Sequence, residues 1–417
     1  MKHFILFIAI VLFGNILLAQ QLTYVPDDNF ENYLETHDPT GNVVPVGDPN
    51  SMGNGIANDD SVYTSRISNV TSLSVPALNI TDLTGIEDFQ SLEELYCFLN
   101  QLTALDVTQN TALQSLDCSN NQLSSLDVSQ NTVLLYLYCG NNQLTALDVT
   151  NTALQGLGCA FNQLTSLDVT QNTALQILRC YDNQLTSLNV LQNTALQNLD
   201  CSNNQLTSLN VSQNTALQSL DCSNNQLTSL DVTQNISLED LSCSVNQLTT
   251  LDVTQNTALT TLLLSGNQLT TLDMRNGNDT NLIYFDATGS PNLTCVFVDD
   301  SSYMHNYWPN AIDASATYVE TQAQCDALGV DEYLAGLILV YPNPFTNVVT
   351  IQIQNGAGIK NINIQNLQGK IVYQKGYIPQ VNLSELPINL SELPTGIYFL
   401  TVETAKGYTY PYKLVKQ

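Results

Sequence analysis

Ten cysteines are the residues of this 417-residue chain whose type and spacing could support metal, disulfide or thiol chemistry. Eight of them recur at steps of 21 residues, with a single step of 20. They are Cys97, Cys118, Cys139, Cys159, Cys180, Cys201, Cys222 and Cys243. The segment has no Cys-x-x-Cys pair and no accompanying histidine, so the spacing does not indicate a zinc site. In the next repeat Leu264 takes the cysteine position, which indicates a buried apolar position occupied by free thiols.

Two further cysteines, Cys295 and Cys325, lie outside this series in a differently written segment. Cysteines of exported proteins are usually oxidised. We expect these two to bond to each other and to close the end of the repeats.

Catalytic motifs of other kinds are absent from the sequence. Beyond residue 19 the only histidines are His37 and His305, and there is no G-x-S-x-G, H-E-x-x-H or phosphate-binding loop. Carboxylates are frequent, so a glycan-active enzyme with a carboxylate pair stays open as an alternative. Short stacked strands build a surface rather than a pocket that raises a carboxyl pKa. We therefore predict a protein that is not an enzyme.

The cysteines belong to a repeat made of two similar halves of ten and eleven residues. One repeat shows the pattern in Leu113, Leu116, Cys118 and Asn121, followed by Leu123, Leu126, Val128 and Asn131. Apolar and polar residues alternate around each cysteine or valine, which is the period of a short strand. Equivalent strands of successive repeats would lie about 4.8 Å apart in parallel sheets. The pattern predicts a mainly β solenoid with short parallel strands on two flanks, in which asparagines bond the backbone at the turns.

The pattern L-x-x-L-x-C-x-x-N-x-L resembles a leucine-rich repeat in which cysteine takes one leucine position. The doubled half is similar to the nested bacterial subclass and covers 92–281 as nine units of about 21 residues. Residues 20–91 resemble the N-terminal cap of secreted leucine-rich proteins of Bacteroidetes, with a short helix expected at 26–35 and then a degenerate repeat. Residues 282–335 resemble the matching C-terminal cap.

After Leu339 the repeat ends, and short alternating segments between Gly, Pro and Asn predict a small β-sandwich at 340–417. The order of its motifs is similar to the type A sorting domain of the type IX secretion system. The resemblance rests on Tyr341, Pro342, Asn343, Pro344, Gly369, Lys370, Gly396, Tyr398 and Lys413. It implies recognition by the type IX secretion machinery, export across the outer membrane, and either release or attachment at the cell surface.

Residues 1–19 are typical of a secretory signal peptide, because Lys2 and His3 precede an apolar run that ends at Ala19. A membrane anchor is the alternative. No later segment is apolar enough to span a bilayer, so we expect no direct membrane insertion after signal removal.

Charge is unevenly distributed along the chain. Residues 21–345 contain 35 Asp and Glu, three Arg and no Lys, whereas residues 346–417 contain six Lys and three Glu. A body this acidic repels phosphate backbones and anionic lipid heads, which argues against nucleic acid as a partner. We expect a protein or glycan ligand at the cell exterior.

The side chains expected to face outward differ between the two halves. In the second half they are uniformly small or acidic, whereas the first half of the N-terminal repeats carries aromatic residues and an arginine. Tyr and Arg dominate binding hot spots. We predict a ligand-binding face formed by Tyr96, Phe98, Tyr136, Tyr138, Ile177, Arg179 and Tyr181. The alternative is that these tyrosines are ordinary β-formers on an exposed sheet.

Aspartates recur on the second half of the repeat, and Asp127, Asp148 and Asp168 are weak calcium candidates. A calcium ion needs six to eight oxygen ligands, so a solvated acidic surface is favoured. A calcium-stabilised structural or adhesive surface protein remains an alternative. Rows of Thr and Ser beside the aspartates resemble the hydroxyl lattice of ice-binding solenoids, but Leu191 interrupts them.

Overall fold

The computed structural model describes residues 20–150, 153–328, 338–353, 359–376, 385–404 and 409–417, in two units divided between Glu320 and Thr321. The signal peptide predicted at 1–19 lies outside these residues. None of the helices in these ranges has the length and apolar character needed to cross a lipid bilayer.

The first unit begins with a cap in which a short helix covers the end of the repeats. Its elements are β1 (Leu22–Tyr24), α1 (Asp28–Thr36), β2 (Ser61–Tyr63) and α2 (Thr64–Ile67). The side chain of Asp27 accepts hydrogen bonds from the backbone N–H of Asn29 and Phe30, so the helix begins two residues later than its predicted start at 26. Phe30 and Leu34 are fully buried and seal the adjacent core.

The first half of every repeat contributes one strand to an eleven-stranded parallel sheet. Its strands are β3 (Ser72–Ser74), β4 (Glu94–Tyr96), β5 (Ser115–Asp117), β6 (Tyr136–Tyr138), β7 (Gly156–Gly158), β8 (Ile177–Arg179), β9 (Asn198–Asp200), β10 (Ser219–Asp221), β11 (Asp240–Ser242), β13 (Thr261–Leu263) and β15 (Tyr284–Asp286). Every pairing is in register, so equivalent residues of successive turns stand side by side.

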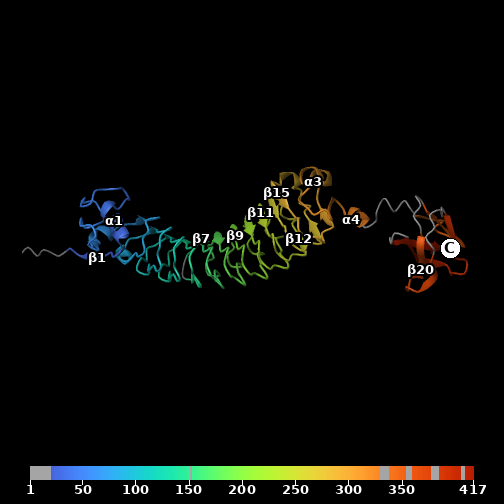
Figure 1. Ribbon diagram of the computed structural model, residues 1–417, viewed down its shortest axis with the longest axis horizontal. Coiled ribbons are helices and arrows are strands. Elements are labelled where there is room, and N and C mark those ends of the chain that lie inside the picture. Colours follow the sequence, from blue (N-terminus) through green and yellow to red (C-terminus); the bar gives the residue numbers. More distant parts are fainter. Residues whose placement is uncertain (1–19, 151–152, 329–337, 354–358, 377–384, 405–408) are drawn as a thin grey trace, which may run out of the picture. The chain divides into compact units, whose positions relative to one another are not determined.

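Among the described residues, the second flank forms a hydrogen-bonded sheet near the C-terminal end of the unit and, elsewhere, a single isolated bridge between Asp106 and Asp127. This sheet consists of β12 (Thr250–Asp252), β14 (Thr271–Asp273), β16 (Cys295–Phe297) and β17 (Thr317–Val319). Within the first unit, Figure 1 shows a curved row of turns with β7, β9 and β11 on its concave side. The remaining short elements are η1 (Ile86–Asp88), η2 (Asp279–Asn281) and α3 (Ser301–Tyr307).

The core between the flanks is a continuous column of leucines, valines and cysteines. All eight ladder cysteines are free and fully buried. Burial raises the pKa of the Cys159 thiol to about 12 and that of Cys180 well above its ordinary value. These thiols are therefore small apolar groups of the core, as the leucine at the equivalent position predicted. Cys295 and Cys325 are the disulfide-bonded cysteines.

Two rows of buried asparagines hold successive turns together. In the first half, Asn183 Nδ2 donates to the carbonyl oxygens of Cys159 (3.0 Å) and Cys180 (3.2 Å), and its Oδ1 accepts from the N–H of Leu164 (2.9 Å). In the second half, Asn193 Nδ2 donates to the carbonyl oxygens of Val169 (2.9 Å) and Asn172 (2.8 Å). The buried Oδ1 of Asn193 has no partner among the described residues. The side-chain amide of Asn183 thus bonds through both its nitrogen and its oxygen, whereas that of Asn193 bonds through its nitrogen alone.

The second unit contains α4 (Gln322–Leu328) and an antiparallel β-sandwich. One sheet contains β18 (Ile338–Tyr341), β19 (Val348–Ile353) and β22 (Glu385–Asn389), and the other contains β21 (Ile371–Gly376), β20 (Ile359–Asn366), β23 (Gly396–Thr404) and β24 (Thr409–Lys416). Val349 and Ile388 of the first sheet join Ile362 and Leu400 of the second in one buried cluster.

The Tyr-Pro-Asn-Pro segment is fixed to the last strand of this sandwich. Asn343 Nδ2 donates to the carbonyl oxygen of Lys413 (2.6 Å), and Asn343 Oδ1 accepts from the N–H of Val415 (2.8 Å). Tyr341 and Pro342 precede this contact, and Pro344 follows it.

The other residues that carry the resemblance lie at a turn or in the last two strands of the same sandwich. Gly369 has φ +75° in the turn between β20 and β21, where the N–H of Lys370 donates to Asn366 Oδ1 (3.0 Å). Gly396 begins β23, and the hydroxyl of Tyr398 donates to the carbonyl oxygen of Pro394 (2.8 Å). The motif residues thus shape the turns and fasten the ends of this domain.

Candidate functional site

A pair of glycines interrupts the outward side chains of the eleven-stranded sheet. Strand β7 presents Gly156 and Gly158, and the pairing register sets Gly158 between Tyr138 of β6 and Arg179 of β8. A Cβ placed on Gly158 would lie 2.8 Å from Cδ1 of Tyr138, so the tyrosine ring lies across the position that a side chain would occupy. The missing side chains leave a hollow between the tyrosine and the arginine.

This hollow has a volume of about 370 Å³. Its aromatic lining is Tyr138, Phe161 and Tyr181, and its charged lining is Asp117 and Arg179. The remaining lining residues are amide, hydroxyl or small side chains: Ser119, Asn120, Gly140, Asn141, Gly158 and Ala160. Aromatic faces, one cation, one carboxylate and two amides therefore converge on one concave spot, a composition typical of binding sites.

Arg179 differs from the other two arginines of the acidic body in having no hydrogen-bond or ion-pair partner for its guanidinium among the described residues. Arg275 forms an ion pair with Asp273 (2.5 Å), and Arg66 donates to the carbonyl oxygen of Gly53 (2.7 Å). The guanidinium of Arg179 makes no hydrogen bond or ion pair within the described ranges, and the residue is exposed. Its register neighbour Asp200 accepts instead from the hydroxyl of Ser202 (2.7 Å). The donors of Arg179 are thus free to bind an acceptor on a ligand.

Asp200 on β9 is the register neighbour of Arg179 and lies outside the lining of the hollow. Burial raises the pKa of the Asp200 carboxyl, while the neighbouring Arg179 and the hydrogen bonds from Ser202 act in the opposite direction. A raised pKa means that its surroundings solvate the carboxylate poorly. Arg179 thus interacts with the Asp200 carboxylate through charge, without forming an ion pair with it.

Phe161 occupies an unfavourable backbone conformation at the rim of the hollow. Its φ is +52°, in the left-handed region, where most other turns carry Asn or Asp at the same position, such as Asn141 and Asp182. This conformation is unfavourable for side chains other than Asn, Asp and Gly. The ring is 51 % exposed and packs edge-on against Tyr181 with ring centroids 5.2 Å apart. Leu99 and Val245 have a similar positive φ in other turns, so this strain belongs to the turn position and not to the hollow alone.

Replacing Phe161 with Asn should raise the free energy of unfolding by about 0.5–1 kcal/mol, because Asn tolerates a positive φ and the lost ring is half exposed. Urea denaturation followed by circular dichroism measures this change. Val245 has φ +55° at the equivalent position, far from the hollow along the sheet, so Val245→Asn is the matched control and should stabilise similarly. A destabilised Phe161→Asn variant beside a stabilised Val245→Asn variant would contradict the strain interpretation.

The structure brings together some of the predicted site residues and separates others. Tyr138, Arg179 and Tyr181 line the hollow. Tyr136 and Ile177 are the first residues of β6 and β8 and lie outside its lining. The hydroxyl of Tyr136 donates to Oε1 of Gln155 (3.3 Å). Tyr96 and Phe98 belong to the β4 turn and are half-buried outside the hollow.

Sequence reasoning missed Asp117 and Phe161. Asp117 has the same type and position as the other aspartates of the first half, such as Asp200, so nothing in the sequence sets it apart. Phe161 carried a signal, because it stands where neighbouring turns have Asn or Asp.

The aspartates of the opposite flank each bind their own turn. Thr150 donates from its backbone N–H (3.0 Å) and its hydroxyl (2.7 Å) to Asp148 Oδ1, and Asp168 accepts in the same way from Thr170. Such hydrogen bonds, from Ser129, Thr150 and Thr170, lower the pKa values of Asp127, Asp148 and Asp168 respectively. The three carboxylates do not form one group: in the described ranges the only set of three close metal-ligating side chains is Asp28, Glu31 and Asp60 in the N-terminal cap.

The melting temperature should not change on addition of millimolar calcium, because an ion bound between neighbouring turns would lack six oxygen ligands. Differential scanning calorimetry in calcium and in EDTA measures this, with magnesium as the ionic-strength control. A rise that grows with calcium concentration would show that the folded state binds the ion.

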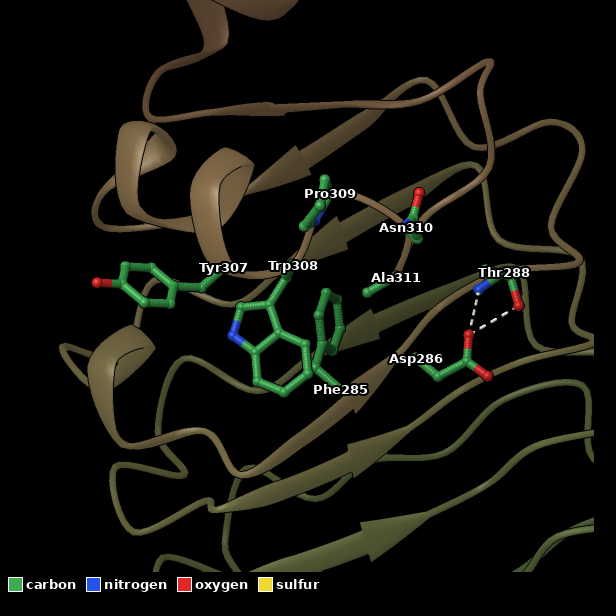
Figure 2. A pocket seen from close by; sticks show the side chains of 8 residues that line it. All are labelled: Phe285, Asp286, Thr288, Tyr307, Trp308, Pro309, Asn310 and Ala311. Carbon is green, nitrogen blue, oxygen red and sulfur yellow. Dashed lines mark hydrogen bonds between the residues drawn. The ribbon is translucent and has the colours of Figure 1, made fainter.

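A second cavity of about 330 Å³ lies in the C-terminal cap (Figure 2). Phe285 and Trp308 form its aromatic wall, with ring centroids 6.2 Å apart. The Asp286 carboxylate accepts from the backbone N–H and the hydroxyl of Thr288, and Figure 2 shows Tyr307 pointing away from this pair. The buried indole N–H of Trp308 has no hydrogen-bond partner among the described residues. This cavity has no cationic side chain, whereas the hollow on β5–β8 has Arg179, so that hollow is the stronger candidate.

Two protein-family models match the sequence. Residues 339–417 match the secretion system C-terminal sorting domain, and residues 194–235 match the leucine-rich repeats model, which spans two copies. No curated protein matches the chain.

Several solved structures are similar to the chain. The functional domain of InlJ from Listeria monocytogenes, described as including a cysteine ladder, is 24 % identical, with 95 % of this chain and 99 % of that one covered and a TM-score of 0.40. An internalin from Listeria monocytogenes is 20 % identical, with 73 % and 100 % covered and a TM-score of 0.47. The leucine-rich effector YopM from Yersinia pestis is 24 % identical, with 56 % and 74 % covered and a TM-score of 0.45.

The sorting domain directs export, so the protein is secreted or carried on the outer-membrane surface. The repeats account for the parallel solenoid and for its fixed period. The chain is therefore a leucine-rich-repeat protein with a C-terminal sorting domain of the type IX secretion system.

Proposed function

We propose that this protein is a non-enzymatic binding protein that holds an extracellular protein or glycan in the hollow on β5–β8. The observation that carries the proposal is the unpaired guanidinium of Arg179 beside the rings of Tyr138, Phe161 and Tyr181. Leucine-rich repeats are typically interaction domains without enzymatic activity. Export through the sorting domain brings this face to ligands outside the cell.

The hydrogen bonds of the opposite flank argue against the alternative that its rows of Thr and Ser form an ice-binding surface. An ice-binding lattice needs hydroxyls free to bind water. The hydroxyls of Thr150 and Thr170 instead donate to Asp148 and Asp168 of their own turns, both at 2.7 Å.

The test is an array of glycans and extracellular proteins probed with the full chain. Truncating both Tyr138 and Arg179 to Ala should weaken the strongest interaction by roughly 30-fold or more, as expected when central hot-spot residues are lost. Tyr284→Ala is the matched control, because Tyr284 is an exposed tyrosine on β15 of the same sheet. Unchanged affinity of the double variant, with its fold verified by circular dichroism, would refute the hollow as the binding site.

A further inference from the structure

We infer that the hollow takes a saccharide residue that carries one carboxylate, an inference that rests on the proposed function. Arg179 would bind the carboxylate, the ring of Tyr138 would pack against the sugar, and Asp117 with the neighbouring amides would bind hydroxyls. The following contacts support each part of this assignment.

The guanidinium of Arg179 is the anchor for the carboxylate. Its planar fork of N–H donors matches a carboxylate with two parallel hydrogen bonds. On one side its register neighbour is Gly158, which has no side chain, so the arginine borders the open hollow. On the other side Asp200 accepts from Ser202 and forms no ion pair with Arg179 in the described structure. A ligand carboxylate would thus have the guanidinium without competition from an internal salt bridge.

The rings supply the apolar part of the site. The ring of Tyr138 lies across Gly158, and Phe161 packs edge-on against Tyr181. A sugar ring presents a face of C–H groups that packs against an aromatic face, and such contacts bury area without requiring exact hydrogen-bond geometry. Arginine beside an aromatic platform therefore fits a ligand that is cyclic and acidic.

The remaining polar groups require a ligand that also donates hydrogen bonds. Asp117 Oδ1 accepts from the N–H and the hydroxyl of Ser119, and the described contacts leave Oδ2 without a partner. Asn141 Nδ2 donates to Asn120 Oδ1 (2.5 Å), which leaves the amide nitrogen of Asn120 and the oxygen of Asn141 for a ligand. The Asp117 carboxylate would repel the carboxylate of a ligand. It can contribute to binding only if the ligand also has hydroxyl or amide groups that donate to it.

The position of the hollow within the sheet favours a saccharide over an extended peptide. Peptides commonly bind sheets by adding a strand to an exposed edge. Strands β5, β6, β7 and β8 are central, and their backbone groups already pair with neighbours on both sides. Recognition here must therefore use side chains, as hydroxyl-rich ligands allow.

The charge of the body limits the ligand to few charges. Residues 21–345 contain 35 acidic residues and three arginines, two of which are engaged. A sulfated polyanion would meet repulsion over most of this surface. A ligand with a single carboxylate placed at Arg179 would meet less of this repulsion.

The experiment compares uronic-acid and sialic-acid oligosaccharides with their carboxyl-reduced counterparts, using the full chain and calorimetry. The native protein should bind at least one acid about tenfold or more tightly than its reduced form. Arg179→Gln should remove this preference while keeping the weaker binding of the reduced sugar. Arg275→Gln is the matched control, since Arg275 is paired and lies on the opposite flank, and it should keep the preference.

Each other outcome refutes the inference. Equal binding of acid and reduced sugars, or a preference that survives in Arg179→Gln, would show that the carboxylate is not recognised. Binding only to a peptide or protein that is lost in the Tyr138→Ala, Arg179→Ala double variant would overturn the saccharide and leave the proposed function standing. A ligand whose binding the double variant does not affect would remove both.

Discussion

The eight ladder cysteines of the native protein should be inert to a thiol reagent, and all eight should react once the chain is unfolded. Each is fully buried, and burial raises the pKa values of these thiols, while the reactive species is the thiolate. Reaction then requires local opening of a turn. An opening free energy of about 4 kcal/mol would slow modification roughly a thousandfold. Colorimetric titration with and without concentrated guanidinium chloride measures the number of thiols that react in the unfolded and in the native protein.

Cys295 and Cys325 provide an internal control for this titration, because disulfide-bonded cysteines should stay silent until a reductant is added. Rapid labelling of several ladder thiols in the native state would show that the column between the flanks is not closed. The same burial implies that unfolding without reductant exposes eight thiols to oxidation, so refolding yields should fall when reductant is omitted.

Truncating Asn183 to Ala should lower the free energy of unfolding by about 3–5 kcal/mol, and truncating Asn193 by about 1–3 kcal/mol. Asn183 serves the carbonyl oxygens of Cys159, Cys180 and Tyr181 and the N–H of Leu164. Asn193 serves two carbonyl oxygens but also buries an unpaired oxygen, whose removal offsets part of the loss. The difference comes from the extra N–H that is left without an acceptor.

Urea denaturation followed by circular dichroism measures these two free energies. Ser187→Ala is the control, because Ser187 lies in the same turn and is exposed, so its effect should be within about 0.5 kcal/mol of zero. Equal losses of unfolding free energy for the Asn183 and Asn193 variants would show that the hydrogen bond from the Leu164 N–H to Asn183 Oδ1 contributes nothing.

The repeated part of the fold could be predicted because its constraints are local. Leu264 in place of a cysteine identified the thiols as core, and the alternation around Cys118 placed its neighbours on the outside. The structure confirms a mainly β parallel solenoid with this assignment of sides. The C-terminal sandwich followed from its alternating segments.

What the sequence did not predict depends on distances between turns. Among the described residues, the second flank pairs as a sheet only at β12, β14, β16 and β17, although the second halves of the earlier repeats have nearly the same sequence as that of β12. The hollow depends on the ring of Tyr138 lying across Gly158, which the pairing register and side-chain direction decide. The helices α2 and α3 in the caps lie in segments too short and irregular to show a helical period.

The in-register pairing of successive strands has a consequence for how this protein can evolve. Residues 197–217 and 218–238 differ at only five positions, as expected for recently copied segments. A tandem duplication of one such segment would add one turn to the solenoid without shifting the pairing register of any other turn. The stack can thus lengthen by whole turns without changing the residues that form the hollow between Tyr138 and Arg179.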